Sequence, residues 1–165
     1  MDQEFVVMPK EKMIKLLHEL MKNSKRSDRD LAKILKVSQP TITRTRKKLE
    51  KTGYIRGYTA LPDLTKLGYE IAAFTFMNIT QADIKSKMNE MQRNPKILFA
   101  STGTGLHGFN CTTVSLHKDF TDFDQFMSDI RSRWATNITD IDSFLVPIRG
   151  MTLKDFSFKQ IGEIE

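Results

Sequence analysis

Residues 27–53 read SDRDLAKILKVSQPTITRTRKKLEKTG, a stretch that contains two helix starts in close succession. Ser27 followed by Asp30 forms an Asp variant of the capping box, and Ser38 offers a second N-cap. Pro40 stands in the first turn of the second helix, where a missing backbone N–H costs nothing, and Gly53 ends that helix. Two short helices joined by a tight turn are typical of a helix-turn-helix, which places its second helix in a DNA groove.

The flanking sequence completes a domain around this pair of helices. Residues 10–22 carry apolar residues at three- and four-residue steps, which predicts an amphipathic helix with one buried stripe. Residues 54–60 are rich in β-formers around a central glycine and predict a short ribbon, the wing. Residues 1–60 are therefore expected to form a winged helix-turn-helix domain.

Charge is divided unevenly along the chain, whose net charge is +6. Residues 1–60 hold 15 Lys and Arg against 7 Asp and Glu, whereas residues 61–165 hold 11 against 13. A basic block beside a nearly neutral one is expected when a single module binds a polyanion. Taken alone, the charge fits a solvated helical surface equally well. The helix pattern therefore has to decide between this interpretation and a DNA-binding module.

The second helix of the pair carries the candidate DNA contacts. With Ile42 pointing inward, the basic residues that fall on the outward face are Arg44, Lys47, Lys48 and Lys51. Residues near its N-terminal end are expected to read base edges, and the lysines beyond them and the flanking arginines to bind phosphates. The predicted DNA-binding residues are Arg29, Ser38, Gln39, Thr41, Thr43, Arg44, Arg46, Lys47, Lys48 and Arg56.

The rest of the chain predicts a second domain of α+β class. Residues 61–68 contain Pro62 and Gly68 and form the expected linker, and residues 151–165 are a C-terminal extension with no assigned role. Between them, residues 69–150 alternate in the order β-α-β-β-α-β, the pattern of a ferredoxin-like sandwich. The expected elements are strand 69–79, helix 81–93, strand 97–102, strand 109–117, helix 120–134 and strand 138–147. Apolar groups on both faces of the strands predict a partner subunit.

Composition limits the remaining functions. No run of 18 apolar residues and no signal peptide are apparent, so a cytoplasmic location is expected. Cys111 is the single cysteine and leaves no internal disulfide, while His107, Cys111 and His117 match no standard zinc spacing. We expect no metal and no cofactor. The glycine-rich residues 103–108 predict a hairpin turn, because they open no helix that would bind phosphate.

Several of these residues resemble the Lrp/AsnC (leucine-responsive, feast/famine) family of regulators. The matching segments are Leu31-Ala32-Lys33 through Val37-Ser38, Thr41-Ile42, Leu49-Glu50, Gly53-Tyr54-Ile55, Gly57-Tyr58-Thr59-Ala60 and Lys66-Leu67-Gly68. The resemblance covers roughly residues 10–148, in its second half by pattern. It implies a winged helix-turn-helix, dimers formed through the C-terminal sheets, often octamers, and DNA binding tuned by amino acids.

Two positions depart from the family pattern. Thr45-Arg46 stands where the family usually has arginine followed by an aliphatic residue, which puts an arginine near the inward face of the helix. Gly108 stands where an acidic residue is common, so an amino-acid ligand would lose a partner for its ammonium group. A glycine that permits a tighter hairpin is an equally good explanation. The expected effector region comprises Thr102, Gly103, Thr104, Gly105, His107 and Gly108, with either no response to common amino acids or a different ligand at the subunit interface.

Two rival functions remain open at this point. Haem-pathway decarboxylases are similar to this family in architecture, and His107 with Arg131 or Arg133 would serve a carboxylated substrate. The basic N-terminal block argues against that enzyme, which has no need of it. An architectural protein that coats DNA with little sequence preference is the second rival.

Overall fold

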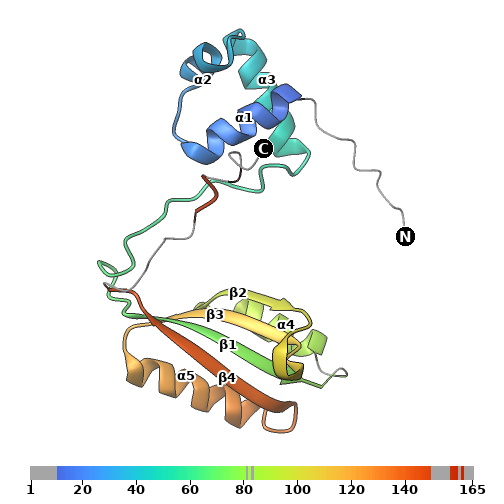
Figure 1. Cartoon of the computed structure of the whole chain (residues 1–165), viewed down its shortest axis with the longest axis vertical. Coiled ribbons are helices and arrows are strands. Elements are labelled where there is room, and N and C mark those ends of the chain that lie inside the picture. The colour runs from blue at the N-terminus through green and yellow to red at the C-terminus, as the bar shows by residue number, and fades with distance from the viewer. Residues whose placement is uncertain (1–10, 81, 83, 150–156, 160, 162–165) are drawn as a thin grey trace. The chain divides into compact units, whose positions relative to one another are not determined.

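The computed structural model describes residues 11–80, 82, 84–149, 157–159 and 161. The chain forms two compact units that divide between Leu61 and Pro62 (Figure 1). Residues 157–159 and 161 group with the first unit, and the rest of the expected extension 151–165 lies outside the described residues.

The first unit contains three helices in its described part, as the sequence predicts. They are α1 (Glu11–Lys22), α2 (Asp28–Leu35) and α3 (Gln39–Lys51). The hydroxyl of Ser27 accepts a hydrogen bond from the backbone N–H of Asp30 at 3.1 Å, so the expected cap opens α2. Leu16, Leu31 and Leu49 are fully buried and join the three helices in one core.

The expected ribbon at residues 54–60 is wrong in secondary structure, because these residues form no strand. A strand needs a neighbouring strand to receive its backbone hydrogen bonds, and none of the described strands pairs with this segment. The segment instead forms hydrogen bonds with the C-terminal part of α3. The N–H of Ile55 donates to the carbonyl of Leu49 at 3.1 Å, and the Tyr58 hydroxyl donates to Glu50 Oε1 at 2.8 Å.

The second unit is a four-stranded antiparallel sheet with the order β2-β3-β1-β4. Its elements are β1 (Ile71–Ile79), α4 (Ile84–Arg93), β2 (Ile97–Thr102), β3 (Cys111–His117), α5 (Phe120–Arg133) and β4 (Ile138–Pro147). This arrangement confirms the ferredoxin-like sandwich, with element ends within a few residues of those expected.

One face of the sheet packs against the two helices. Met77 of β1, Met91 of α4 and Phe126 of α5 belong to this core. Cys111 lies in the same layer, 3% exposed, with its sulfur 3.9 Å from that of Met91. Burial raises the pKa of the Cys111 thiol to about 11, so the group is neutral.

A buried histidine lies at the end of β3 in the same layer. His117 is 0% exposed, and its Nε2 is 2.8 Å from the hydroxyl of Ser115. The carboxylate of Asp122 lies 3.8 Å from its Nδ1. Burial nevertheless lowers the pKa of His117, because desolvation outweighs the attraction of that carboxylate.

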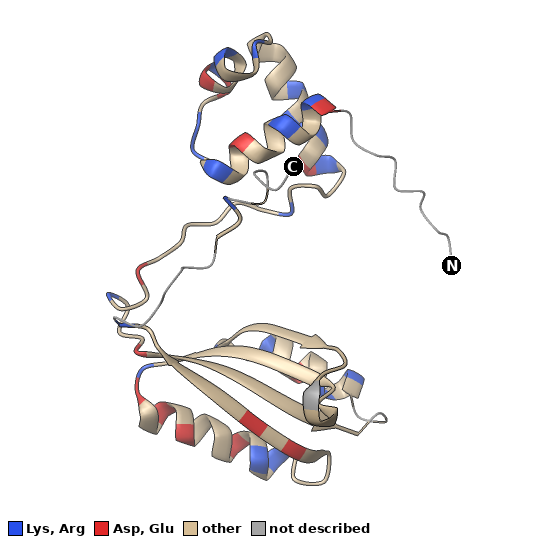
Figure 2. Ribbon diagram, in the orientation of Figure 1, with Lys and Arg blue, Asp and Glu red and all other residues tan. Residues whose placement is uncertain are grey.

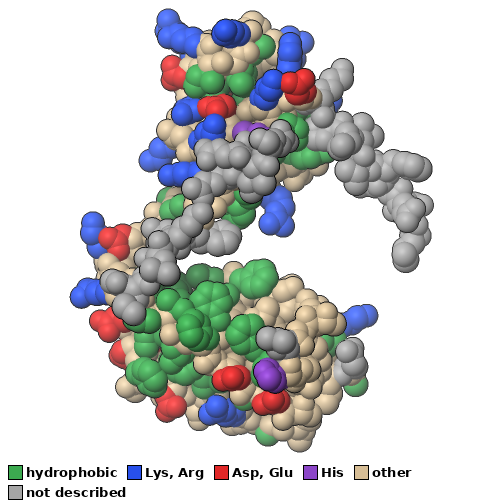
Figure 3. All heavy atoms as spheres, in the orientation of Figure 1, with side chains coloured by type: hydrophobic (Ala, Val, Ile, Leu, Met, Phe, Trp, Pro, Cys, Tyr) green, Lys and Arg blue, Asp and Glu red, His purple; other side chains and the backbone are tan. Residues whose placement is uncertain are grey.

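The opposite face of the sheet carries an apolar row. The registers place Phe99 opposite Val114, Val114 opposite Phe74, and Phe74 opposite Phe144, so one residue from each strand lines up across the sheet. Phe144 is 67% exposed and Phe99 54% exposed. Figure 3 shows hydrophobic side chains gathered on this unit. Both faces of the sheet are therefore apolar, as expected from the sequence.

Candidate nucleic-acid interface

Helix α3 presents a basic surface because its apolar side is fixed in the core. Ile42 and Leu49 are buried against α1 and α2, which turns the opposite side of the helix to solvent. The side chains exposed there include Arg44, Lys47, Lys48 and Lys51. Lysine and arginine are spread over all three helices of this unit, whereas Asp and Glu mark α5 and β4 of the other (Figure 2). The first unit thus offers a convex basic element suited to a phosphate-lined groove.

The N-terminal end of α3 carries the polar residues expected to meet base edges. Gln39 and Arg44 are exposed there, and Thr41 is half-buried. Ser38 precedes the helix with cap geometry, but its hydroxyl pairs with that of Thr41 at 2.8 Å and accepts no backbone hydrogen bond. Among these side chains, Gln39 and Arg44 are therefore better placed to contact the base edges of DNA.

Two of the predicted contacts are held inside the unit by Asp28, the first residue of α2. Thr43 donates its hydroxyl hydrogen to Asp28 Oδ2 at 2.6 Å, and Arg46 Nε donates to Asp28 Oδ1 at 2.9 Å. A second guanidinium nitrogen of Arg46 donates to the carbonyl of Arg26 at 3.3 Å. The hydrogen bond from Thr43, followed by the charge and hydrogen bond of Arg46, lowers the pKa of Asp28. We call this group of Asp28, Thr43 and Arg46 the helix clamp.

The helix clamp explains the arginine near the inward face of α3. The side chain of Arg46 is 18% exposed and spans from α3 to the start of α2, so it fixes the angle between the two helices. Its partner Asp28 also places a negative charge at the N-terminus of α2, where the helix dipole favours it. Sequence patterns do not reveal this pairing, because Asp28 and Arg46 lie in different helices.

Lys12 of α1 borders the same surface, and sequence reasoning missed it. A groove runs between the first turn of α1 and the side of α3, lined by Glu11, Lys12, Met13, Thr41, Arg44, Thr45 and Lys48. Lys15 forms an ion pair with Glu11 at 2.5 Å, which leaves Lys12 as the α1 cation beside Arg44 and Lys48. Their placement depends on how α1 packs against α3, which residue spacing within one helix does not reveal.

The remaining predicted contacts flank the helices. Arg29 is exposed in the first turn of α2, and Arg56 is exposed in the segment after α3. Both positions fit contacts with the DNA backbone that set register.

The predicted effector residues form the hairpin between β2 and β3. The N–H of Gly103 donates to the carbonyl of Asn110 at 3.0 Å, and a short 3-10 turn covers Leu106–Gly108. His107 and Gly108 both have left-handed backbones, with φ of 58° and 78°. That conformation favours glycine and gives a structural reason for Gly108. The hairpin brings the predicted residues together at an exposed tip.

The described part of the chain contains no group of three His, Cys, Asp or Glu side chains able to hold a metal ion. Within the same residues, none of the helices combines the length and apolar character required to cross a membrane.

Comparison with known proteins identifies the class of this fold and site. Residues 10–56 match the family model described as winged helix-turn-helix DNA-binding. An uncharacterized HTH-type transcriptional regulator of Pyrococcus horikoshii, PH0061, is 28% identical over 81% of this chain and 87% of its own. LrpC of Bacillus subtilis is 31% identical over 52% and 60% of the two chains. The leucine-responsive regulatory protein of Rhizobium meliloti is 36% identical over 45% and 48%.

Solved structures share the two-unit architecture. The complex of the Neisseria meningitidis regulator NMB0573 with L-Met superposes with a TM-score of 0.80 at 20% identity, covering 92% of this chain and 95% of that one. Escherichia coli AsnC superposes with a TM-score of 0.75 at 18% identity, covering 90% and 98%. The fold and the basic α3 surface define a DNA-binding transcription regulator. The chain is similar in sequence to regulators named for Lrp and in fold to AsnC.

Proposed function

We propose that the chain regulates transcription by binding a specific double-stranded DNA sequence as a dimer or higher assembly in the cytoplasm. The observation that carries this proposal is the exposed basic side of α3, held at a fixed angle by the helix clamp. A rigid recognition helix with its own supporting contacts is what sequence-specific readout requires.

The side chains of the first unit divide into three roles in this proposal. Gln39 and Arg44, with Thr41 beside them, read base edges, because amide and guanidinium groups form bidentate hydrogen bonds with bases. The cations farther along and around the helices bind phosphates and supply salt-dependent affinity. This second group comprises Lys12, Arg29, Lys47, Lys48 and Arg56. Thr43 and Arg46 position α3 through Asp28.

The apolar row on the sheet supports the dimer. Phe74, Phe99 and Phe144 are exposed in the single chain, and apolar patches rimmed by polar groups are typical of subunit interfaces. A second copy of the same sheet would cover the row symmetrically. The helix-turn-helix units of both copies would then contact one DNA molecule.

The hairpin at residues 102–108 supports a small-molecule effector at the subunit interface. The Neisseria meningitidis protein was solved as a complex with L-Met, which shows that a neighbour in fold binds an amino acid. With glycine at position 108, the hairpin of this chain offers no acid for an ammonium group there. We infer an effector other than a common α-amino acid at this place.

The regulator is proposed to have no enzymatic activity, since its relatives are named as transcriptional regulators. A protein that merely coats DNA is the competing function. A ratio of specific to non-specific affinity of about 10³ or more at a stated salt concentration marks a regulator, and a ratio near one marks a coat protein.

Selection of bound fragments from random DNA tests the proposal. The selected site should be a pseudo-palindrome whose half-site centres lie about one helical turn, or a multiple of it, apart, because a two-fold dimer presents two α3 helices. Recovery of an asymmetric single half-site bound by a monomer would contradict the dimeric reading.

A further inference from the structure

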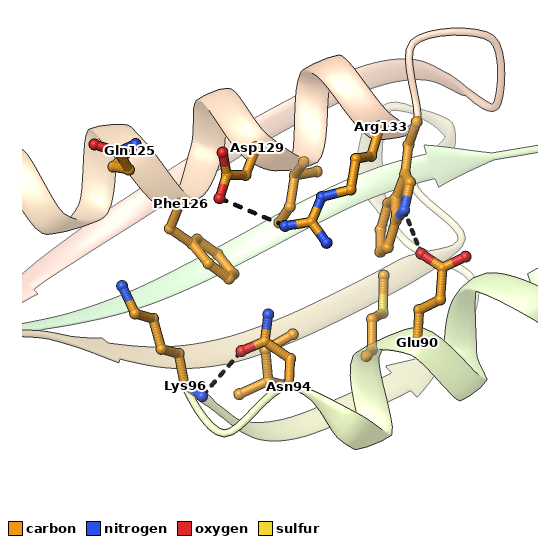
Figure 4. Close-up of a pocket in the computed structure, with 11 residues that line it drawn as sticks. Glu90, Asn94, Lys96, Gln125, Phe126, Asp129 and Arg133 are labelled. Carbon is orange, nitrogen blue, oxygen red and sulfur yellow. Dashed lines mark hydrogen bonds and ion pairs between the residues drawn. The ribbon is translucent and has the colours of Figure 1, made fainter.

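A pocket lies between α4 and α5 on the helix-covered side of the second unit (Figure 4). Two side-chain contacts involve residues of its lining. The Trp134 indole N–H donates to Glu90 Oε2 at 2.7 Å, and Lys96 forms an ion pair with Asp122. The pocket has a volume of about 140 Å³.

The floor of the pocket is apolar. It is formed by Met91, Ile97, Phe126, Ile130 and the indole of Trp134. An apolar cavity of about 150 Å³ in another protein takes up benzene, so a phenyl ring or a branched alkyl group of similar size fits this volume.

The mouth of the pocket carries hydrogen-bond donors. Arg133 extends from α5 into the space between the helices, and the amide nitrogen of Asn94 points into it from the end of α4 (Figure 4). The orientation of this amide follows from its other atom, since Asn94 Oδ1 accepts the backbone N–H of Lys96 at 3.0 Å. Arg133 touches Asp129 at 3.4 Å, a long contact between exposed side chains that holds the guanidinium weakly.

The acids at the mouth are already engaged. Glu90 accepts the hydrogen bond from Trp134 and pairs with Lys87 at 3.1 Å, which lowers the pKa of Glu90. Asp129 pairs with Arg133, whose guanidinium carries five N–H donors in a fork. Donors therefore remain for a ligand, while the nearby carboxylates keep their own partners.

We propose that this pocket binds a small carboxylate with a compact apolar tail. The tail lies against Phe126 and Ile130, and the carboxylate accepts hydrogen bonds from the guanidinium of Arg133 and the amide of Asn94. Arginine binds carboxylates in bidentate geometry, and charge-assisted hydrogen bonds of this kind are stronger than neutral ones. The site is independent of the proposed DNA contacts and of the hairpin at residues 102–108.

The chain contains its own reporter for the test, because Trp134 is the single tryptophan and lines the pocket. Phenylacetate is the probe, titrated into the full-length protein while tryptophan fluorescence is followed. Saturable binding is expected with a dissociation constant on the order of 1 mM, typical of a ligand of this size. 2-Phenylethanol should bind at least about tenfold more weakly, because its neutral hydroxyl carries no negative charge for the guanidinium. Phenethylamine should bind more weakly still, because its ammonium group is cationic and accepts no hydrogen bond.

Two substitutions assign the binding to the mouth. Arg133→Gln should lower the affinity for phenylacetate at least about tenfold. Arg131→Gln, in the same helical turn but outside the pocket lining, should leave that affinity unchanged. Asn94→Asp keeps the acceptor for the Lys96 N–H and places a negative charge at the mouth. This variant should lose phenylacetate and gain affinity for phenethylamine.

Several results would overturn the proposal. They are no saturable signal up to about 10 mM phenylacetate, equal affinity for the acid and the alcohol, or equal effects of Arg131→Gln and Arg133→Gln. Loss of phenylacetate binding in the His107→Ala variant would instead place the binding site at the hairpin. Because no DNA is present, these outcomes leave the proposed regulatory function untouched.

Discussion

Arg44 and Lys47 share the outward side of α3 but should differ in what they recognise. Arg44→Ala is expected to relax base preference and to cost about 1 to 3 kcal/mol on the best site, since a bidentate contact to a base is lost. Lys47→Ala should weaken all sequences alike and reduce the salt slope by about one. Binding titrations on specific and random DNA at several salt concentrations measure both effects. Equal losses on the two kinds of DNA for both variants would remove this division of roles.

His117 should make the second unit less stable in mild acid. Burial lowers the pKa of His117 in the folded state, so on acidification the unfolded chain takes up a proton first, near pH 6.5. The free energy of unfolding therefore decreases as the pH falls below that value. The loss is at most about 1.4 kcal/mol per pH unit. The neighbouring carboxylate of Asp122 keeps its charge in this range, because the hydrogen bond from Lys96 lowers the pKa of Asp122.

Trp134 fluorescence during urea unfolding measures this dependence, because the tryptophan lies in the same unit. His117→Gln should flatten the pH dependence in that range, whereas His107→Gln, at the exposed hairpin, should keep it. An unchanged slope in His117→Gln would show that another group titrates.

Sequence reasoning at the level of single residues succeeded where the neighbours are close in the chain. The cap at Ser27 was predicted and confirmed from a three-residue spacing. Sequence reasoning could not identify the partner of Arg46, because Asp28 contacts Arg46 only when α2 packs against α3.

At the scale of elements, the helix clamp predicts that two arginines of α3 contribute differently to stability. Arg46→Gln should lower the free energy of unfolding of the first unit by about 1 to 2 kcal/mol, because Asp28 is left with a partly buried, unpaired charge. Arg44→Gln, on the exposed side, should change it by less than about 0.5 kcal/mol. Far-UV circular dichroism during denaturation compares the two variants. Similar stabilities would mean that the ion pair is dispensable for the angle between α2 and α3.

Most elements were predictable from the sequence because each has a pattern of its own. The apolar spacing of α5, for example, predicts a helix without knowledge of its neighbours. Residues 54–60 have the composition of a strand, but a strand also needs a partner, and composition does not supply one.

For the whole molecule, the apolar row should control the proposed assembly. Phe144→Lys is expected to shift the protein from the proposed dimer to a monomer, because a charge in the row would be buried against the second copy without a partner. Phe120→Lys is the matched control, since Phe120 is 66% exposed but lies on α5 instead of the open sheet face. Light scattering during size-exclusion chromatography gives the mass. A dimer that survives Phe144→Lys, or dissociates in Phe120→Lys, would place the interface elsewhere.

The buried thiol of Cys111 has a practical consequence for spectroscopy. A sulfur that is covered by α4 and protonated at neutral pH reacts slowly with maleimides and methanethiosulfonates, which attack through the thiolate. The natural chain therefore behaves toward such reagents as if it had no cysteine, and a cysteine introduced by Lys51→Cys would be labelled selectively. Two spin labels in an assembled dimer would then report the spacing of its recognition helices by electron resonance, with the native core left unmodified.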